Sequence, residues 1–302
     1  MDTLLFALEK SFKEISKLIR NQNSLDLGGL LNESNVSGDD VKELDIVSND
    51  LFKRNLAKCS LVRTIGSEEE DELYETTHID APYLVCYDPL DGSSNVDVNI
   101  TTGTIFAVYQ YDEHGKIESG RNMVMSGYCL YGGCCQYVLA YNGIVSMYQY
   151  IPSTGCFSKY ISSKNGFSKI HENIKIQEKG TIFSLNEAHK HKWCDKRFQP
   201  FIETMIEQKY NARWVGSMVA DGHRTLIKGG FFAYPANESN LSGKIRLLYE
   251  AYPFAHIFET AGGIATDGTT NILDIPYPEK LHKKTPVILS SKTEYDIFSK
   301  LE

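Results

Sequence analysis

The sequence predicts a layered fold of mixed strands and helices, of the α/β or α+β class. Stretches with apolar residues at helical spacing alternate with short runs rich in β-branched and aromatic residues. No repeat or low-complexity tract interrupts this alternation. A β-rich first half gives way to a mixed second half near residue 176. Because 302 residues are enough for two ordinary domains, we expect one domain over 1–176 and another over 177–302.

The first half is expected to begin with a helix, because its apolar residues recur every three or four positions over residues 3–20. Residues 24–40 are rich in Gly, Asn, Ser and Asp, which favours a mobile loop. A second helix is expected over residues 44–58. Strands are expected at residues 60–65, from Tyr83 to Asp88, and at 103–111, 136–140 and 144–149.

The second half contains both kinds of element. We expect strands at residues 181–185, 244–249 and 286–289, and a helix over residues 198–209. A further helix is predicted to begin at Pro253, since proline suits a first helical turn, and to end at Gly262-Gly263.

The net charge of −8 is unevenly distributed. From Asp39 to Asp91 there are 14 acidic and five basic residues. A nucleic-acid partner would require the opposite sign, and no apolar stretch is long enough to span a bilayer. We therefore expect neither a nucleic-acid nor a membrane partner.

The chain carries seven cysteines and no Cys-x-x-Cys spacing, and no secretion signal is recognised at its start. This pattern is typical of reduced thiols, so a cytoplasmic location is expected.

The most informative segment runs from Tyr83 to Asn95, Tyr-Leu-Val-Cys-Tyr-Asp-Pro-Leu-Asp-Gly-Ser-Ser-Asn. Asp88, Asp91 and the carbonyl of Leu90 offer hard oxygen ligands, which favour Mg²⁺ or Mn²⁺ over Zn²⁺. The small residues that follow can turn backbone N–H groups toward a phosphate. A metal-activated water acting on a phosphate ester is the chemistry that this combination favours. A proline-containing turn with an Asx cap is the structural alternative.

Three other segments could complete such a site, although each has an ordinary structural interpretation. Glu68 to Glu72 follows a predicted strand and could supply further carboxylates, or form a solvated surface. The segment from Lys42 to Asp50 has the pattern of an ordinary helix start with Asp45 near the first turn, and by itself it would not be noticed. Lys244, Arg246 and Glu250 would share one face of a strand and could serve a phosphate and a metal, or form a ladder of salt bridges.

Taken together, these segments resemble class I fructose-1,6-bisphosphatase, a family of the Mg²⁺-dependent, lithium-sensitive phosphatases. The likeness runs from about residue 10 to about residue 290. The motifs that carry it are Asn35-Val-Ser-Gly-Asp39, Leu44-Asp-Ile-Val-Ser-Asn-Asp50, Ser67-Glu-Glu69, Asp88-Pro-Leu-Asp-Gly-Ser-Ser-Asn95, Gly103-Thr-Ile-Phe106, Val215-Gly-Ser-Met-Val-Ala-Asp221, Tyr234-Pro-Ala-Asn237 and Lys244-Ile-Arg-Leu-Leu-Tyr-Glu250.

The resemblance implies an αβαβα sandwich of two mixed sheets between helices, and two to three Mg²⁺ (or Mn²⁺) ions per subunit. The implied metal ligands are Glu68, Glu69, Asp88, Leu90, Asp91 and Glu250. The implied catalytic groups are Asp45, Glu69 and Asp39. The implied substrate-binding residues are Asp91, Gly92, Ser93, Ser94, Asn186, His189, Arg213, Trp214, Met218, Tyr234, Lys244 and Arg246.

In this family the arginine that matches Arg213 reaches the active site of the neighbouring subunit, so a homo-oligomer, either a dimer or a tetramer, is expected. His189 and Trp214 stand where the family usually has tyrosine, which leaves the contact with the distal phosphate open. The family's AMP site uses a Gly- and Thr-rich segment before the first helix. Here the chain begins at Met1-Asp2, and Pro82 replaces a lysine of that site, so little or no AMP inhibition is expected.

The expected activity is hydrolysis of fructose 1,6-bisphosphate at carbon 1. Sedoheptulose-1,7-bisphosphatase activity, alone or as a dual specificity, is the closest alternative, and an inositol phosphatase is a weaker one. A sugar-phosphate sensor that has lost turnover is the alternative outside enzymes.

Overall fold

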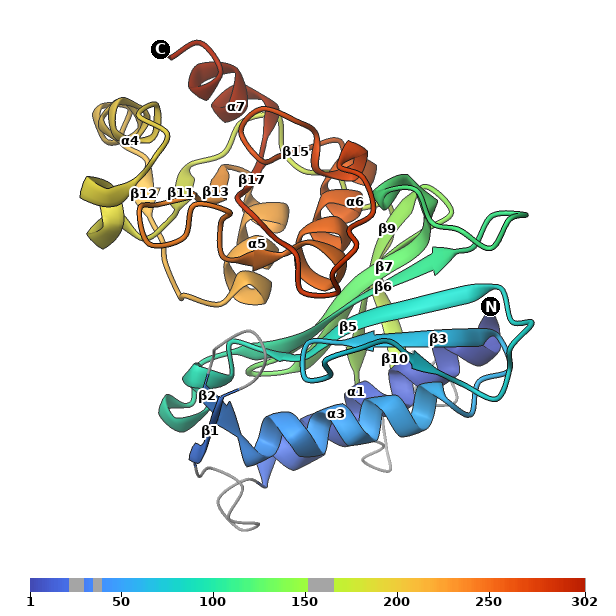
Figure 1. Cartoon of the computed structure of the whole chain (residues 1–302). Helices are drawn as coiled ribbons and strands as arrows, with labels where there is room; N and C mark the ends of the chain where they lie inside the picture. Colours follow the sequence, from blue (N-terminus) through green and yellow to red (C-terminus); the bar gives the residue numbers. More distant parts are fainter. Residues whose placement is uncertain (22–29, 35–39, 152–165, 302) are drawn as a thin grey trace.

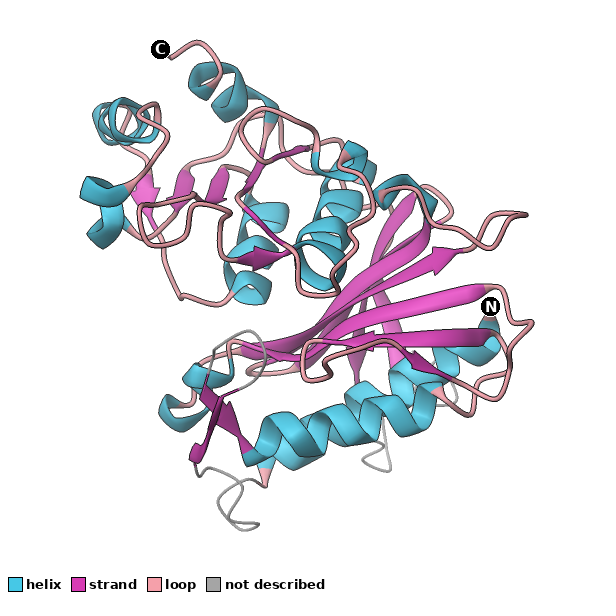
Figure 2. Cartoon of the chain, in the orientation of Figure 1, coloured by secondary structure: helices cyan, strands magenta, loops and turns pink. Residues whose placement is uncertain are grey.

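The structure is a computed structural model that describes residues 1–21, 30–34, 40–151 and 166–301. Its helices and strands stack in five layers, α-β-α-β-α, as Figures 1 and 2 show. Three clusters of buried apolar side chains fill the spaces between successive layers. The layered α/β class predicted from the sequence is therefore confirmed.

The first outer layer consists of helices α1 (Asp2–Arg20) and α3 (Glu43–Leu56), which pack side by side. Both cover one face of an eight-stranded sheet (Figure 1). Leu4, Leu8 and Phe12 of α1 meet Val85 and Tyr87 of the sheet in one buried cluster. The helical spacing of the apolar residues of α1 thus becomes a buried stripe, as the sequence predicts.

The eight-stranded sheet is antiparallel except between β3 and β5, which run parallel. Its interior strand β5 is buried on both faces, because α5 and α6 cover the face opposite α1 and α3. The strand order is β10 (Phe167–His171), β9 (Ile144–Tyr150), β8 (Cys135–Tyr141), β7 (Met123–Tyr131), β6 (Thr102–Gln110), β5 (Tyr83–Asp91), β3 (Val62–Ser67) and β4 (Tyr74–Glu75).

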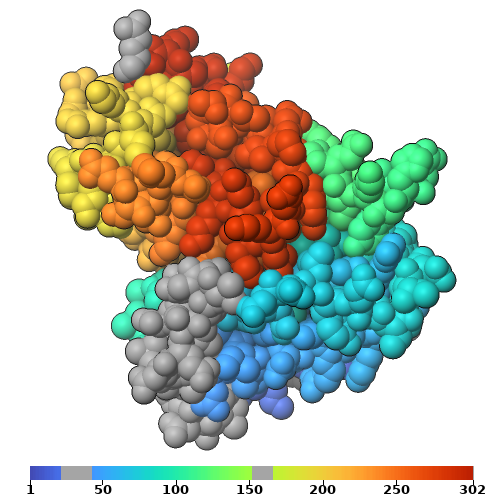
Figure 3. Space-filling view, viewed as in Figure 1, coloured from blue at the N-terminus to red at the C-terminus, as the bar shows by residue number. Residues whose placement is uncertain are grey.

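The middle layer consists of helices α5 (Met218–Lys228) and α6 (Tyr252–Thr260), which lie between the two large sheets. Pro253 occupies the first turn of α6, and Gly262 and Gly263 follow its end, as predicted. The largest apolar cluster joins this layer to both sheets. The cluster therefore holds the two halves of the chain together, and Figure 3 shows them meeting along a broad seam.

The second large sheet has the order β12 (Asn211–Ala212), β11 (Ile182–Ser184), β13 (Phe231–Tyr234), β17 (Val287–Ser290) and β15 (Ile264–Thr266). Helices α4 (Phe198–Glu207) and α7 (Lys292–Phe298) cover its outer face through an aromatic cluster around Phe198, Phe201, Phe231 and Phe298. The remaining elements are two small sheets, β1 (Leu30–Ser34) with β2 (Asp40–Lys42) and β14 (Ile245–Arg246) with β16 (Lys284–Thr285), and the short helices η1 (Ser93–Val98), η2 (Gly120–Asn122), η3 (Glu187–Lys192), η4 (Leu247–Ala251) and η5 (Ile272–Asp274).

Two local predictions were wrong. Within the expected loop over residues 24–40, residues 30–34 form strand β1 and Asp40 begins β2, while residues 22–29 and 35–39 lie outside the described part of the chain. The expected strand over residues 244–249 is only two residues long, because the chain enters the π-helical turn η4 at Leu247. Lys244, Arg246 and Glu250 therefore do not share one face of a single strand, contrary to the prediction from the sequence.

None of the described helices combines the length and the apolar character needed to cross a membrane.

Candidate active site

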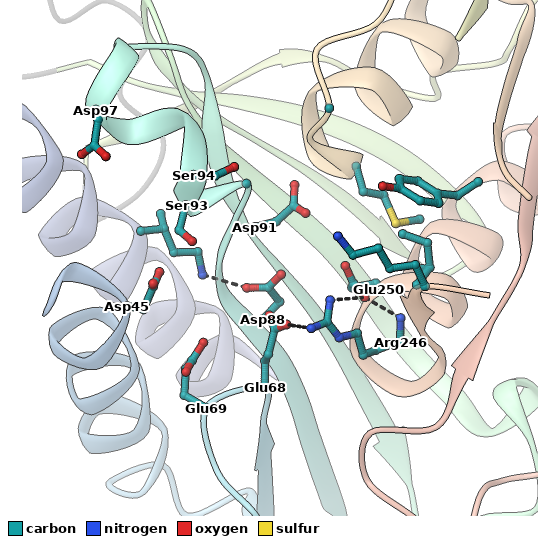
Figure 4. A pocket seen from close by; sticks show the side chains of 17 residues that line it. Asp45, Glu68, Glu69, Asp88, Asp91, Ser93, Ser94, Asp97, Arg246 and Glu250 are labelled. Carbon is teal, nitrogen blue, oxygen red and sulfur yellow. Dashed lines mark hydrogen bonds and ion pairs between the residues drawn. The ribbon is translucent and has the colours of Figure 1, made fainter. Parts of the chain in front are cut away.

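A cavity of about 480 Å³ lies where the end of strand β5 meets the second half of the chain. Carboxylates dominate one side of it, and cationic and aromatic side chains approach from the other (Figure 4). The lining residues are Asp45, Glu68, Glu69, Asp88, Leu90, Asp91, Gly92, Ser93, Ser94, Asp97, Gly216, Met218, Tyr234, Lys244, Ile245, Arg246 and Glu250.

Asp88 and Asp91 both face this cavity, although residues three apart in a regular strand point to opposite faces. The pairing of β5 with β6 shifts in register between them, which resets the alternation. The backbone N–H of Leu90 donates to Asp88 Oδ1 at 2.9 Å and holds that carboxylate in place. The predicted strand end at Asp88 was therefore wrong: the strand continues through the bulge to Asp91.

Glu250, from the second half of the chain, lies close to the two aspartates in space. Carboxylate oxygens of Asp88, Asp91 and Glu250 all lie within 4.8 Å of one another, and all three residues are buried. The wide turn η4 carries Glu250 back toward β14, so that its carboxylate accepts a hydrogen bond from the backbone N–H of Arg246. The sequence predicted that these residues would meet, but not the turn that brings them together.

The three carboxyl groups share an environment that disfavours negative charge. Burial raises the pKa of Asp88 well above its usual value, and the nearby carboxylates of Glu68, Asp91 and Glu250 add to the effect. Burial also raises the pKa of Glu250 to about 8, although Arg246 acts in the opposite direction. A divalent cation among these oxygens would remove the mutual repulsion.

Arg246 brings a positive charge next to this cluster. Its Nη2 lies 2.8 Å from Oε1 of Glu68, and its Nη1 lies 4.0 Å from Oε2 of Glu250. The salt-bridge interpretation of the segment from Lys244 to Glu250 is therefore correct for Arg246. Because Arg246 also lines the cavity, its guanidinium can face a phosphate as well.

The second half of the chain holds Asp91 in place. Ser217 Oγ donates to Asp91 Oδ2 at 2.6 Å, and the backbone N–H of Val219, in the first turn of α5, donates to the same oxygen at 2.8 Å. Burial raises the pKa of Asp91 to about 6, while these two hydrogen bonds act against the rise. Gly92 has φ +74°, and a Cβ there would meet Ser217 Cβ at 2.7 Å, so only glycine allows this approach.

Asp45 and Glu69 approach the cavity on the side of helix α3. Asp45 lies in the first turn of α3 and is 4% exposed, and Glu68 and Glu69 directly follow strand β3. Figure 4 shows Asp45 and Glu69 on one side of Asp88 and Glu250 on the other. The structure thus gathers the carboxylates that the sequence singled out, except Asp39, which lies outside the described residues.

The residues predicted to hold the substrate divide into two groups. Gly92, Ser93, Ser94, Met218, Tyr234, Lys244 and Arg246 line the cavity. Asn186, His189, Arg213 and Trp214 do not line it. His189 and Arg213 are exposed, and Asn186 caps the short helix η3 by accepting a hydrogen bond from the N–H of Ala188. Trp214 packs against Tyr234, with ring centroids 5.7 Å apart.

Sequence reasoning missed several residues that shape the site. Asp97, Gly216 and Ile245 line the cavity, and Ser217 fixes Asp91. The position of Ser217 immediately before helix α5 would have predicted only a local cap, and its hydroxyl instead donates to Asp91, 126 positions away. Nothing in the pattern around Ile245 could have indicated a lining position.

An all-oxygen cluster of buried carboxylates beside Arg246 and Lys244 has the donor set of a metal-dependent phosphatase. Comparison with known proteins agrees with that class. The family description "Fructose-1-6-bisphosphatase, N-terminal domain" matches residues 1–162, and "Fructose-1-6-bisphosphatase, C-terminal domain" matches residues 176–302. The chain therefore belongs to the fructose-1,6-bisphosphatase family, whose members are metal-dependent phosphatases.

Similar proteins include the class 1 fructose-1,6-bisphosphatase of Persephonella marina, which is 41% identical over 97% of this chain and 89% of the relative. Fructose-1,6-bisphosphatase 1 of Rattus norvegicus is also 41% identical, over 99% of this chain and 82% of the relative. The crystal structure of Leishmania major fructose-1,6-bisphosphatase in holo form superposes with a TM-score of 0.91 at 35% identity, covering 98% of this chain and 92% of that one.

Proposed function

We propose that this protein hydrolyses fructose 1,6-bisphosphate to fructose 6-phosphate and inorganic phosphate. The observation that carries the proposal is the convergence of Asp88, Asp91 and Glu250 within 4.8 Å, in a cavity that also presents Lys244 and Arg246. The names of the similar proteins support the choice of substrate.

The donor set fits Mg²⁺ or Mn²⁺. All side-chain ligands are carboxylates, and Leu90 also lines the cavity. Burial, together with the neighbouring carboxylates, raises the pKa values of Asp88 and Glu250, so a bound cation would relieve the cost of their negative charge. We propose that Glu68, Glu69, Asp88, Leu90, Asp91 and Glu250 hold two to three ions per subunit. When bound, such ions activate water and neutralise charge on the phosphate and the leaving oxygen.

Side chains of the protein accept the proton of the attacking water and bind the phosphate. Asp45 and Glu69 accept the proton of the attacking water and orient it, and Asp39 is proposed to assist. Ser93, Ser94 and Arg246 hold the phosphate on carbon 1 opposite that water. As the bond from phosphorus to the water oxygen forms, the bond from phosphorus to the sugar oxygen breaks. The leaving oxygen takes a proton from solvent water, and the proton accepted by Asp45 and Glu69 returns to the solvent.

The distal phosphate is proposed to lie on the other side of the cavity. Tyr234 and Lys244 line that side, next to Met218. Asn186, His189, Arg213 and Trp214 are proposed to complete it. Because Arg213 is exposed and lies outside its own cavity, it is available to a neighbouring copy, which supports a homo-oligomer, either a dimer or a tetramer.

We also propose a domain boundary near residue 176 and a cytoplasmic location. The strands of the eight-stranded sheet end by His171, and those of the five-stranded sheet begin at Ile182, which supports domains over 1–176 and 177–302. The proposed cytoplasmic location rests on the cysteine pattern of the sequence, which has seven cysteines and no Cys-x-x-Cys spacing.

Phosphate release from fructose 1,6-bisphosphate, measured with purified protein and Mg²⁺, tests the proposal. The proposal predicts turnover that stops when the metal is chelated. A parallel reaction with sedoheptulose 1,7-bisphosphate measures the alternative specificity. Binding of the sugar bisphosphate without any phosphate release would instead show a sensor and would overturn the proposed function.

A further inference from the structure

Asn49 carries a buried amide that does not line the cavity. It lies in the core, behind the carboxylates proposed to bind the metal. Its Oδ1 accepts two hydrogen bonds, from Ser67 Oγ at 2.7 Å and from Tyr87 OH at 2.9 Å. Its Nδ2 donates to Glu70 Oε1 at 2.8 Å. The two hydroxyls and the carboxylate leave only one consistent orientation of the amide. Asn49 therefore joins three elements, α3, the end of β3, and β5.

Each element that Asn49 joins carries a group of the proposed active site. Asp45 lies one helical turn before Asn49 in α3. Ser67 Oγ, besides donating to Asn49, accepts the backbone N–H of Glu69 at 3.3 Å. Tyr87 directly precedes Asp88 in β5, and its carbonyl accepts the backbone N–H of Glu68 at 3.1 Å. A displacement of the Asn49 amide would therefore reach several carboxylates at once.

The same network continues into the second half of the chain. His282 Nε2 lies 3.0 Å from the carbonyl oxygen of Glu70, and its Nδ1 lies 2.6 Å from Tyr249 OH. A carbonyl only accepts, so Nε2 carries the proton and Nδ1 accepts from the tyrosine in the neutral ring. Tyr249 is fully buried in the turn η4 and directly precedes Glu250.

We propose that Asn49 and His282 are positioning residues that hold the carboxylates of both halves of the chain at the spacing needed for metal binding. The proposed function underlies this inference, because it assigns the metal to those carboxylates. Hydrogen bonds join Tyr87 to Asn49 and Asn49 to the side-chain carboxylate of Glu70. From Glu70 the connection continues through its backbone carbonyl, which accepts from His282, and His282 in turn accepts from Tyr249. Like charges that repel one another need such support when the metal is absent, and supporting groups behind metal ligands typically change affinity or activity 10- to 100-fold when they are removed.

Helix α3 provides a matched control for Asn49. Asn55 lies in the same helix and is 5% exposed, against 4% for Asn49. Its Nδ2 donates to Ser11 Oγ at 3.1 Å and to Glu14 Oε2 at 3.0 Å, both in helix α1 and away from the cavity. Asn49→Ala and Asn55→Ala therefore each remove a buried amide from α3. Only Asn49 forms hydrogen bonds with residues next to the carboxylates that follow β3 and end β5, whereas the hydrogen bonds of Asn55 go to α1.

The experiment measures Mn²⁺ binding by electron paramagnetic resonance in the absence of substrate, together with the Mg²⁺ concentration that gives half-maximal phosphate release. For Asn49→Ala we expect the Mn²⁺ affinity to fall about tenfold or more, and the Mg²⁺ concentration for half-maximal phosphate release to rise by a similar factor. For Asn55→Ala we expect both quantities to stay within about twofold of those of the unchanged protein. Thermal unfolding recorded for both variants separates loss of stability from loss of metal affinity. Equal weakening in the two variants would show that Asn49 only stabilises the fold, and would overturn the proposal.

Single hydroxyl deletions provide a second arm if Asn49→Ala does not fold. Tyr249→Phe removes the donor to His282 without opening a cavity, and Tyr210→Phe is its control, because Tyr210 OH donates to Glu294 at 2.6 Å, outside the cavity. We expect Mn²⁺ affinity to fall threefold or more in Tyr249→Phe and to stay within twofold in Tyr210→Phe. A smaller change in Tyr249→Phe, or an equal one in both variants, overturns the inference.

The unchanged protein separates the two levels of the proposal. If it neither binds Mn²⁺ nor releases phosphate, the proposed function fails. If it does both while Asn49→Ala and Tyr249→Phe behave as their controls do, the proposed function stands and only the positioning role is lost.

Discussion

The two sides of the cavity are built in different ways. On the metal side, Asp88, Asp91 and Glu250 are buried, and hydrogen bonds from Leu90, Ser217 and Arg246 hold them in place. On the sugar side, Arg213 and His189 are exposed and lie outside the cavity. The chain therefore completes its proposed metal site by itself, whereas its proposed contacts with the distal phosphate are only partly assembled within one copy.

This difference predicts which side of the cavity should tolerate amino-acid substitutions. Buried like charges depend on every neighbour, so a single substitution on the metal side should affect both chemistry and stability. Substitution of the exposed groups on the sugar side should change the stability of the fold little, and should affect substrate binding alone. Five expectations, from the largest effect to the smallest, follow from this contrast.

The substitution Asp88→Asn should have the largest effect. It removes a proposed metal ligand, so phosphate release should fall by at least about 100-fold. It also removes one of several buried like charges, so the metal-free variant should unfold at a higher temperature than the metal-free unchanged protein. Phosphate-release kinetics and thermal unfolding in chelator test the two effects. The exposed Asp296→Asn serves as control, and an active Asp88→Asn would contradict the metal assignment.

Removal of the metal should come next. Without a divalent cation, the carboxylates repel a substrate that is itself a polyanion, so affinity should drop by about tenfold or more. Calorimetry with a non-hydrolysable bisphosphate analogue, with Mg²⁺ and then with chelator, measures this. Equal affinity in both conditions would mean that the sugar side alone binds the substrate.

Arg213→Ala should affect substrate binding alone. A lost charge-assisted hydrogen bond to phosphate should raise KM about tenfold and leave kcat within about twofold. Steady-state kinetics check this, with the exposed Lys196→Ala as a matched loss of one cation. An unchanged KM would remove Arg213 from the sugar side, and a collapse of kcat would place it with the chemistry.

His223 shows how a buried titratable group behaves outside this cavity. Burial lowers its pKa to about 4, and its Nδ1 lies 2.8 Å from Tyr128 OH. The folded state therefore binds fewer protons than the unfolded state between pH 6.5 and 4, so this group makes stability fall as the pH decreases. The free energy of unfolding should decrease by about 3 kcal/mol at most through this group. Because His223 lies outside the cavity, the activity of a His223 variant at neutral pH should equal that of the unchanged protein.

Denaturant unfolding at several pH values, with His223→Asn for comparison, measures this contribution. The variant should lose less stability than the unchanged protein over that interval. Parallel curves for the two proteins would show that His223 titrates normally.

AMP should have the smallest effect. By the family resemblance, Arg121 matches a residue of the AMP site. Its Nη1 lies 2.6 Å from Glu259 Oε2 and its Nε lies 2.8 Å from Asp274 Oδ1, and Pro82 offers no charge. We expect phosphate release to be unchanged at AMP concentrations up to about 1 mM, because these ion pairs compete with a nucleotide phosphate. Inhibition in the micromolar range would contradict this expectation.

The sequence predicted most elements, as well as Asp88 and Asp91, because their signals are local, whereas the proposed roles of Asp45 and Glu69 came from the family resemblance. Helix α1 follows from its apolar spacing, and the segment from Asp88 to Ser94 carries its chemistry in seven consecutive residues. The layered class followed from the alternation of elements. Local signals of this kind survive in the structure because burial of one face decides them.

The parts that could not be predicted depend on contacts across the chain. The turn η4 stands where a strand was predicted. It brings Glu250 back to accept a hydrogen bond from the backbone N–H of Arg246, whose side chain pairs with Glu68 from the first half of the chain, and no periodicity reveals this arrangement. Likewise, the role of Asn49 depends on partners 18 to 38 positions away, and that of His282 on a carbonyl 212 positions away. Tertiary hydrogen bonds of this kind leave no pattern in one sequence.

The most direct test of the proposed metal side is a crystal structure of the protein soaked with Mn²⁺ and the reaction products, with anomalous scattering recorded for the ion. We expect anomalous density among the carboxylates of Asp88, Asp91 and Glu250, with the phosphate facing Arg246. A map in which the ion lies elsewhere, while these three carboxylates stay together without it, would contradict that assignment.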